Sequence, residues 1–225
     1  MAALKAGPWA QLVGFLAVVA AAVGVGTYLL MPERELPVYQ PGDVNPAVVD
    51  PAVAHVQNHR ILPFSLLNQL GDTVELADVD GQILVAAFFF TRCPTICPVM
   101  TSQMQRVAAQ YADEPRLRLL SHSVTPEADS VPVLAAYAAR YGADPDRWWF
   151  LTGPKRDIYT LARRSYFACL SEGDGGLQDF VHTENLVLVD ARGRLRGFYD
   201  GTSQVEVDQL IADIELLLDA LPSAP

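Results

Sequence analysis

ILVAAFFF at residues 83–90 runs directly into TRCPTICP at residues 91–98, and this stretch decides the fold. The first part is continuously apolar, as expected of a strand that is buried on both faces of a sheet. Pro98 suits the first turn of a helix, and apolar residues follow it at helical spacing. Cys93 and Cys97 are therefore expected where a central strand passes into a helix. Because a helix N-terminus stabilises a thiolate, this setting suits a metal-binding pair or a redox-active pair.

On both sides of this stretch, the pattern of apolar residues predicts alternating strands and helices. Strands are expected at residues 64–68, 73–76, 83–90, 117–124, 148–151, 185–189 and 195–199, and helices at 98–111, 130–141, 154–167 and from 203 onward. This order predicts an α/β fold with a central mixed, partly parallel sheet flanked by helices. Met100 and Met104 lie on the apolar stripe of the first helix, so we interpret them as core residues rather than thioether ligands.

Residues 9–31 form an almost wholly apolar run without a charged side chain. As a helix the run would span roughly 34 Å, more than the hydrocarbon core of about 30 Å. It is longer than the apolar region of about 7–15 residues in a signal peptide, and no clear cleavage site follows. We therefore expect an uncleaved transmembrane helix. Lys5, in the short segment 1–8, favours a cytoplasmic N-terminus, which places the rest of the chain on the outer, periplasmic face of a cell inner membrane.

Residues 32–61 are rich in proline and lack helical periodicity, which predicts an extended linker to a domain at residues 62–225. His55 and His59 fall in this segment and are interpreted as solvent-exposed rather than as a metal-binding pair. Scattered carboxylates are interpreted as solvated surface, namely Asp113, Glu114, Glu127 and Asp129. The net charge of −10 argues against a nucleic-acid partner, and three cysteines are too few for a disulfide scaffold.

Two sulfurs and one imidazole would make a three-coordinate site. Thiolates select Cu(I) and imidazole also accepts Cu(II), whereas a closed structural zinc site needs four ligands. His182 is the favoured third donor, because it lies in a loop that enters the predicted strand at 185–189. His122, inside a strand pattern, is better explained as a hydrogen-bonded sheet histidine, and Cys169 as a small buried residue. The cysteine pair could instead form a disulfide and exchange with a partner.

The motif FFFTRCPTICP at residues 88–98, together with the distant His182, resembles the Sco/SenC family of membrane-anchored copper chaperones. SVTPE at 123–127, WFLTG at 149–153 and the hairpin at 190–201 agree with this resemblance. It implies a thioredoxin-like fold, with Cys93, Cys97 and His182 as copper ligands and the two cysteines also as a redox-active pair. The implied partner is the copper-A subunit of cytochrome c oxidase or another copper-transfer protein.

One position departs from the family pattern. Many members carry Asp where this chain has Thr125, and that Asp is viewed as a helper near the site. Its role is in doubt here, and we do not transfer it to the nearby Asp129. Within the motif, Thr95 stands where an acidic or polar residue is often found between the cysteines, which is a mild change.

The first functional hypothesis is a membrane-anchored copper chaperone that delivers copper to, or helps mature, the copper A site of cytochrome c oxidase. The alternative is a thiol–disulfide oxidoreductase that reduces cysteines of a partner in the same compartment. Apart from this oxidoreductase activity, we do not expect an enzyme. A peroxidase is disfavoured, because neither cysteine has the Pro-x3-Thr-x2-Cys spacing of peroxiredoxins.

Overall fold

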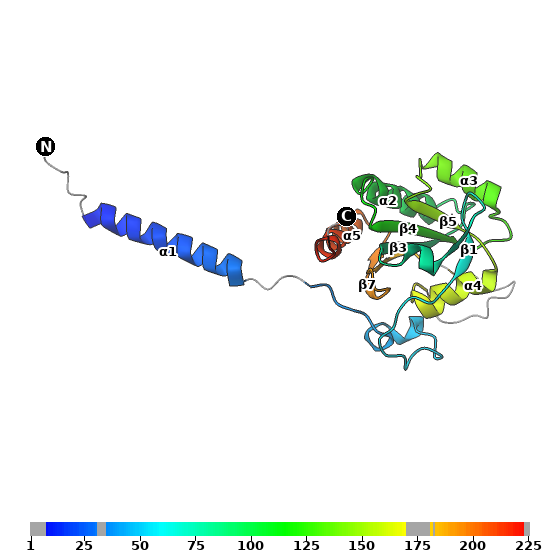
Figure 1. Ribbon diagram of the computed structural model, residues 1–225, viewed down its shortest axis with the longest axis horizontal. Helices are drawn as coiled ribbons and strands as arrows, with labels where there is room; N and C mark the ends of the chain where they lie inside the picture. The colour runs from blue at the N-terminus through cyan, green and yellow to red at the C-terminus, as the bar shows by residue number, and fades with distance from the viewer. Residues whose placement is uncertain (1–7, 31–34, 170–180, 182, 223–225) are drawn as a thin grey trace. The chain divides into compact units, whose positions relative to one another are not determined.

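The computed structural model describes residues 8–30, 35–169, 181 and 183–222 (Figure 1). The chain divides between Glu35 and Leu36 into two compact units. The first unit contains α1 (Pro8–Leu30), a helix without acidic residues in its first turn or basic residues in its last. Within the parts of the chain that the structure describes, no helix meets the combined requirement of length and apolar character for crossing a membrane. The transmembrane helix expected at residues 9–31 is therefore not confirmed by the structure.

The second unit is built on a five-stranded sheet with the order β5-β4-β3-β6-β7. Its strands are β3 (Ile83–Phe89), β4 (Leu117–Ser123), β5 (Trp148–Leu151), β6 (Asn185–Val189) and β7 (Leu195–Asp200). β3, β4 and β5 are parallel, whereas β6 and β7 are antiparallel to their neighbours. β3 is the central strand and all of its residues are buried. The structure confirms the mixed sheet predicted from the sequence.

Alternate residues of β3 face two separate hydrophobic cores, because successive side chains of a strand point to opposite faces. One core joins Val85 and Ala87 to three helices, α2 (Ile96–Gln110), α3 (Val131–Arg140) and α5 (Gln204–Asp219). The other joins Ala86 and Phe88 to α4 (Lys155–Thr160), to the π-helical turn Leu161–Ser165, and to the hairpin of β1 (Ser65–Leu67) and β2 (Thr73–Glu75). In Figure 1, α2 and α4 accordingly lie on opposite sides of the sheet.

The helix that follows β3 begins earlier than predicted. α2 starts at Ile96, which puts Cys97 and Pro98 in its first turn. Proline is tolerated there because the first N–H groups of a helix have no partner within the helix. Met100 and Met104 are each 1% exposed in the first core, which confirms their interpretation as core residues.

The extended linker predicted at residues 32–61 is wrong from Leu36 onward. Leu36, Val49 and Ile61 are buried, and the backbone of Tyr39 bridges to Leu195 in β7. Two short 3-10 helices, Pro41–Asp43 and Pro46–Val48, lie within this segment. Its apolar residues are irregularly spaced among prolines, so they bury against the domain without producing a helical or strand pattern in the sequence.

The two histidines of this segment differ. His55 is exposed, as predicted. His59 is only 2% exposed, which corrects the prediction of a solvent-exposed side chain. Its Nε2 is hydrogen-bonded to the carbonyl oxygen of Ser165 at 2.8 Å, and its ring packs against Phe167. Burial lowers the pKa of His59, so the ring contributes to packing as a neutral group.

Candidate functional site

The two cysteines lie at the carboxyl end of the central strand. β3 ends at Phe89, Cys93 occupies the loop that follows, and Cys97 lies in the first turn of α2. The backbone N–H of Val124 donates to the carbonyl of Phe89 at 2.8 Å, which holds the end of β4 beside the start of this loop. The predicted junction of strand and helix is confirmed, and the fold places both thiols next to the neighbouring parallel strand.

The thiols are close together and largely covered. Cys93 is 8% exposed and Cys97 is 3% exposed, and both are free thiols. The N–H of Cys97 donates to Sγ of Cys93 at 3.5 Å, and the hydroxyl of Thr95 lies 3.8 Å from the same sulfur. Arg92, Pro94 and Thr95 are exposed, so the loop that carries Cys93 lies at the surface. Cys93 is therefore a buried side chain within a short surface loop.

The two thiols have very different acidities. Burial raises the pKa of Cys93, but hydrogen bonds from Cys97 and Thr95 outweigh it and lower this pKa to about 7. Burial, followed by the neighbouring groups of Cys93 and Asp129, raises the pKa of Cys97 to about 12. At neutral pH, about half of Cys93 is therefore thiolate whereas Cys97 keeps its proton, so Cys93 is the more reactive thiol.

Asp129 is part of this site and is wrongly predicted as solvated surface. It is 0% exposed. Its Oδ1 accepts from the hydroxyl of Thr91 at 2.5 Å, and its Oδ2 accepts from the hydroxyls of Ser123 at 2.6 Å and Thr125 at 3.0 Å. The N–H of Thr91 also donates to Oδ2, at 3.2 Å. The signal in the sequence is weak, because the three hydroxyl residues come from two separate segments that only the fold brings together.

His182 lies outside the described residues, so its role as third ligand stays a prediction. Its neighbour Val181 is described and is 4% exposed. The N–H of Val181 donates to the hydroxyl of Tyr159 at 3.5 Å, and this hydroxyl donates to the carbonyl of Val124 at 2.9 Å. Val181 is thereby connected to the end of β4, beside the cysteine loop. Among the residues that the structure describes, no group of three His, Cys, Asp or Glu side chains is arranged to hold a metal ion.

The remaining candidate donors, His122 and Cys169, are buried in the core. His122 is fully buried, its Nδ1 is 3.3 Å from the carbonyl oxygen of Ala87, and its ring stacks on Phe88. Burial lowers the pKa of His122 to about 4, so the ring is neutral. Cys169 is buried at 6% exposure. Both residues confirm the structural interpretation made from the sequence.

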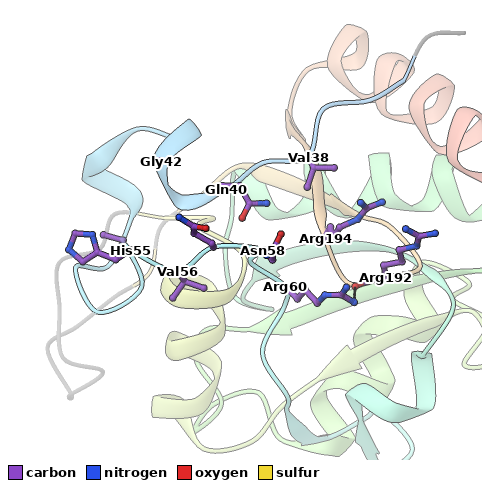
Figure 2. Close-up of a pocket in the computed structure, with 11 residues that line it drawn as sticks. Val38, Gln40, Gly42, His55, Val56, Asn58, Arg60, Arg192 and Arg194 are labelled. Carbon is purple, nitrogen blue, oxygen red and sulfur yellow. Dashed lines mark hydrogen bonds between the residues drawn. The ribbon is translucent and has the colours of Figure 1, made fainter.

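A groove of about 970 Å³ lies between the segment at 38–60 and the turn that joins β6 to β7 (Figure 2). Three arginines line it, Arg60, Arg192 and Arg194. Arg60 donates to the carbonyl of Arg192, and Arg194 pairs with Asp190. This turn follows Val189, which pairs with Leu84 near the start of β3, whereas the cysteines follow the end of β3. The groove is therefore separate from the cysteine site.

Comparison with known proteins shows one consistent family. Residues 54–219 match the model of the family described as SCO1/SenC. The SCO1 protein homolog of Bacillus subtilis (strain 168) is 34% identical over 160 residues, covering 70% of this chain and 82% of the relative. A protein of Stutzerimonas stutzeri that is named for copper binding is 30% identical over 159 residues, covering 67% of this chain and 75% of the relative. The matches to the mitochondrial SCO2 homologs of Mus musculus and Bos taurus span 63% and 54% of those proteins, less than two thirds of their length.

Solved structures agree with this match. A SCO1/SenC family lipoprotein from Bacillus anthracis str. Ames has a TM-score of 0.63 at 28% identity, covering 72% of this chain and 96% of the other. BsSco, described as having a disulfide switch and as a member of the Sco family of cytochrome c oxidase assembly proteins, has a TM-score of 0.60 at 33% identity, covering 70% and 92%. The thioredoxin-like fold implied by the resemblance is confirmed. Because the matched residues 54–219 include the loop of Cys93 and Cys97, the evidence of sequence, fold and site converges, and this chain belongs to the SCO1/SenC family.

Proposed function

We propose that this protein is a copper chaperone that binds copper through Cys93, Cys97 and His182 and delivers it to, or helps mature, the copper A site of cytochrome c oxidase. The observation that carries the proposal is the hydrogen bond from the N–H of Cys97 to Sγ of Cys93, which brings both thiols to the first turn of one helix. The naming of the Stutzerimonas relative for copper binding, and the description of the BsSco family as cytochrome c oxidase assembly proteins, support it.

The donor set suits copper as a transferable cargo. Thiolates are soft donors for Cu(I), and imidazole extends the site to Cu(II). Three donors leave the ion accessible to the ligands of an acceptor protein. The exposed residues around Cys93 place its loop at the surface, where an acceptor can approach it.

The experiment loads the full chain with Cu(I) and with Cu(II) and measures stoichiometry and affinity by competition with a chelator. Cys93→Ser, Cys97→Ser and His182→Ala are each expected to weaken binding, and His55→Ala serves as the matched control because His55 is exposed and outside the site. Unchanged binding by His182→Ala would remove that residue from the ligand set. Unchanged binding by both cysteine variants would reject the copper site.

A second candidate function is favoured by the difference in pKa between the two thiols. The Cys93 thiolate would attack a disulfide of a partner, forming a mixed disulfide and releasing one partner thiolate. Cys97, after losing its proton, would attack Cys93 and release the second partner thiolate. The partner would be reduced by two electrons and the Cys93–Cys97 pair oxidised. A measured Cys93–Cys97 reduction potential well above that of the partner disulfide would make this reaction unfavourable.

Membrane attachment through residues 9–31 and a periplasmic location of residues 62–225 are also part of the proposal. The supporting observation is the uncharged apolar run itself, preceded by Lys5. The test is fractionation of cells that express the full chain, followed by protease treatment of spheroplasts. Retention in the washed membrane with a protease-sensitive C-terminal domain is the expected result, and release into the soluble fraction would reject the anchor.

A further inference from the structure

A buried carboxylate ties together the backbone on which the cysteine loop is mounted. Asp129 accepts hydrogen bonds from Thr91, at the start of that loop, from Ser123, at the end of β4, and from Thr125, in the turn after β4. All four contacts are donated to Asp129, so both of its side-chain oxygens act as acceptors. Because Asp129 is 0% exposed, its side-chain oxygens have no contact with bulk solvent.

Thr91 makes two hydrogen bonds to Asp129. Its N–H and its hydroxyl both donate to Asp129, and it lies two residues before Cys93. The N–H of Cys93 then donates to the carbonyl of Phe90 at 3.3 Å, and Sγ of Cys93 accepts from Cys97. These hydrogen bonds, joined by the peptide bond between Phe90 and Thr91, connect Asp129 through the loop to the first turn of α2.

We propose that Asp129 is a positioning residue for the cysteine site, which fixes Thr91 against the end of β4 and so sets the geometry of Cys93 and Cys97. Asp129 acts through the loop, since its hydrogen bonds go to Thr91, Ser123 and Thr125. The inference rests on the proposed function, because copper is one of its readouts. It also accounts for Thr125, whose hydroxyl serves in this chain as a donor to Asp129.

Two substitutions at Asp129 separate position from charge. In Asp129→Asn, the side-chain oxygen can still accept from the N–H of Thr91 and from the hydroxyls of Ser123 and Thr125. The hydroxyl of Thr91 can rotate to accept from the new NH2 group. In Asp129→Ala, all of these buried donors lose their acceptor. Positioning therefore predicts that Asn retains the site and Ala disrupts it, whereas an effect of charge alone predicts that both variants fail alike.

The chain offers a matched control in Asp213 of α5. It is 5% exposed and accepts from the hydroxyl of Tyr199 at 2.7 Å and from the side chain of Gln209 at 2.7 Å. Asp213→Ala removes a buried, hydrogen-bonded carboxylate that has no hydrogen bond to the cysteine loop among those described. It controls for a general loss of stability.

The experiment measures Cu(II) affinity and the thiolate-to-copper charge-transfer spectrum of each full-length variant, with circular dichroism to check folding. Asp129→Ala is expected to weaken Cu(II) binding by about 10–100-fold and to change the spectrum. Asp129→Asn is expected to stay close to the unsubstituted chain, and Asp213→Ala to leave the spectrum unchanged. A folded Asp129→Ala variant with the original affinity and spectrum overturns the proposal, as does an Asp129→Asn variant as impaired as Asp129→Ala.

A second pair of variants keeps the test valid if Asp129→Ala does not fold. Thr91→Val removes only the hydroxyl donor and Thr91→Ser restores it, so the affinity is expected to fall in the first and to recover in the second. Equal affinities in the two variants contradict the proposal.

The Cys93–Cys97 reduction potential, measured in glutathione buffers, needs no copper and so distinguishes failure of this inference from failure of the copper proposal. Asp129→Ala is expected to raise the potential, because a loosened loop holds the thiols together less well. Asp129→Asn and Asp213→Ala are expected to leave it unchanged, and an unchanged potential in a folded Asp129→Ala variant contradicts the inference.

Discussion

The backbone N–H of Cys97 donates a hydrogen bond to Sγ of Cys93 at 3.5 Å. This contact places the sulfur of one cysteine at the start of the helix that carries the other. The helix N-terminus stabilises a thiolate on Cys93, and its pKa is lowered. Burial instead raises the pKa of Cys97. The two residues of the motif therefore differ in chemistry although both are cysteines.

We expect Cys93 to react with iodoacetamide and Cys97 to stay largely unmodified at neutral pH. The thiolate is the nucleophile, so the rate at Cys93 should rise with pH through a midpoint of about 7. The measurement is peptide mass spectrometry after timed alkylation between pH 5 and pH 9, a range of about two units on each side. Cys97→Ser is the control, and faster modification of Cys97 than of Cys93 would reverse the assignment.

Copper affinity is expected to increase with pH above neutrality. A bound thiolate has lost its proton, and Cys97 holds its proton up to a pKa of about 12. Between pH 7 and pH 9, Cu(I) affinity should therefore rise by about tenfold per pH unit, because one proton from Cys97 is displaced on binding. Chelator competition at several pH values measures the slope. A slope of zero would show that Cys97 is not a ligand.

Acid is expected to destabilise the domain partly through His122. Its pKa is lowered from 6.5 to about 4, so the unfolded chain binds a proton more tightly than the folded one. The free energy of unfolding should be unaffected by His122 above pH 6.5 and should decrease as the pH falls toward 4, by about 3 kcal/mol in total. Urea denaturation of His122→Phe should lack this part of the pH dependence. His55→Phe is the exposed control, and identical pH profiles for the original chain and His122→Phe would contradict the prediction.

A chain that begins at residue 62 is expected to be less stable than one that begins at residue 36. Leu36, Val49 and Ile61 are buried against the domain, and His59 is hydrogen-bonded to Ser165. Removing these groups exposes the apolar surface that they cover. Thermal denaturation of the two chains measures the difference. Equal melting temperatures would show that residues 36–61 act as a linker that adds no stability to the domain.

The sequence predicts a structural element correctly where a single short segment contains the complete pattern of apolar residues. The apolar run at 83–90 is long enough to identify a strand buried on both faces, and it places Cys93 and Cys97 at its end. The prediction fails where burial depends on distant segments. The backbone N–H groups of Tyr39 and Ile61 donate to the carbonyls of Leu195 and Gly193 in a hairpin that comes well over a hundred residues later. Asp129 is buried because Thr91 and Ser123 meet it only after β3 and β4 have paired.

The position of β3 between β4 and β6 also determines the order in which the domain can fold. β4 follows β3 after a single helix, whereas β6 is synthesised about 100 residues after β3 begins. A nascent chain can pair β3 with β4, and β4 with β5, early in synthesis. The other edge of this wholly apolar strand waits for β6, and closing so distant a pair is slow. Until then the open edge of β3 is a site for aggregation, and an intact C-terminal hairpin is what protects it.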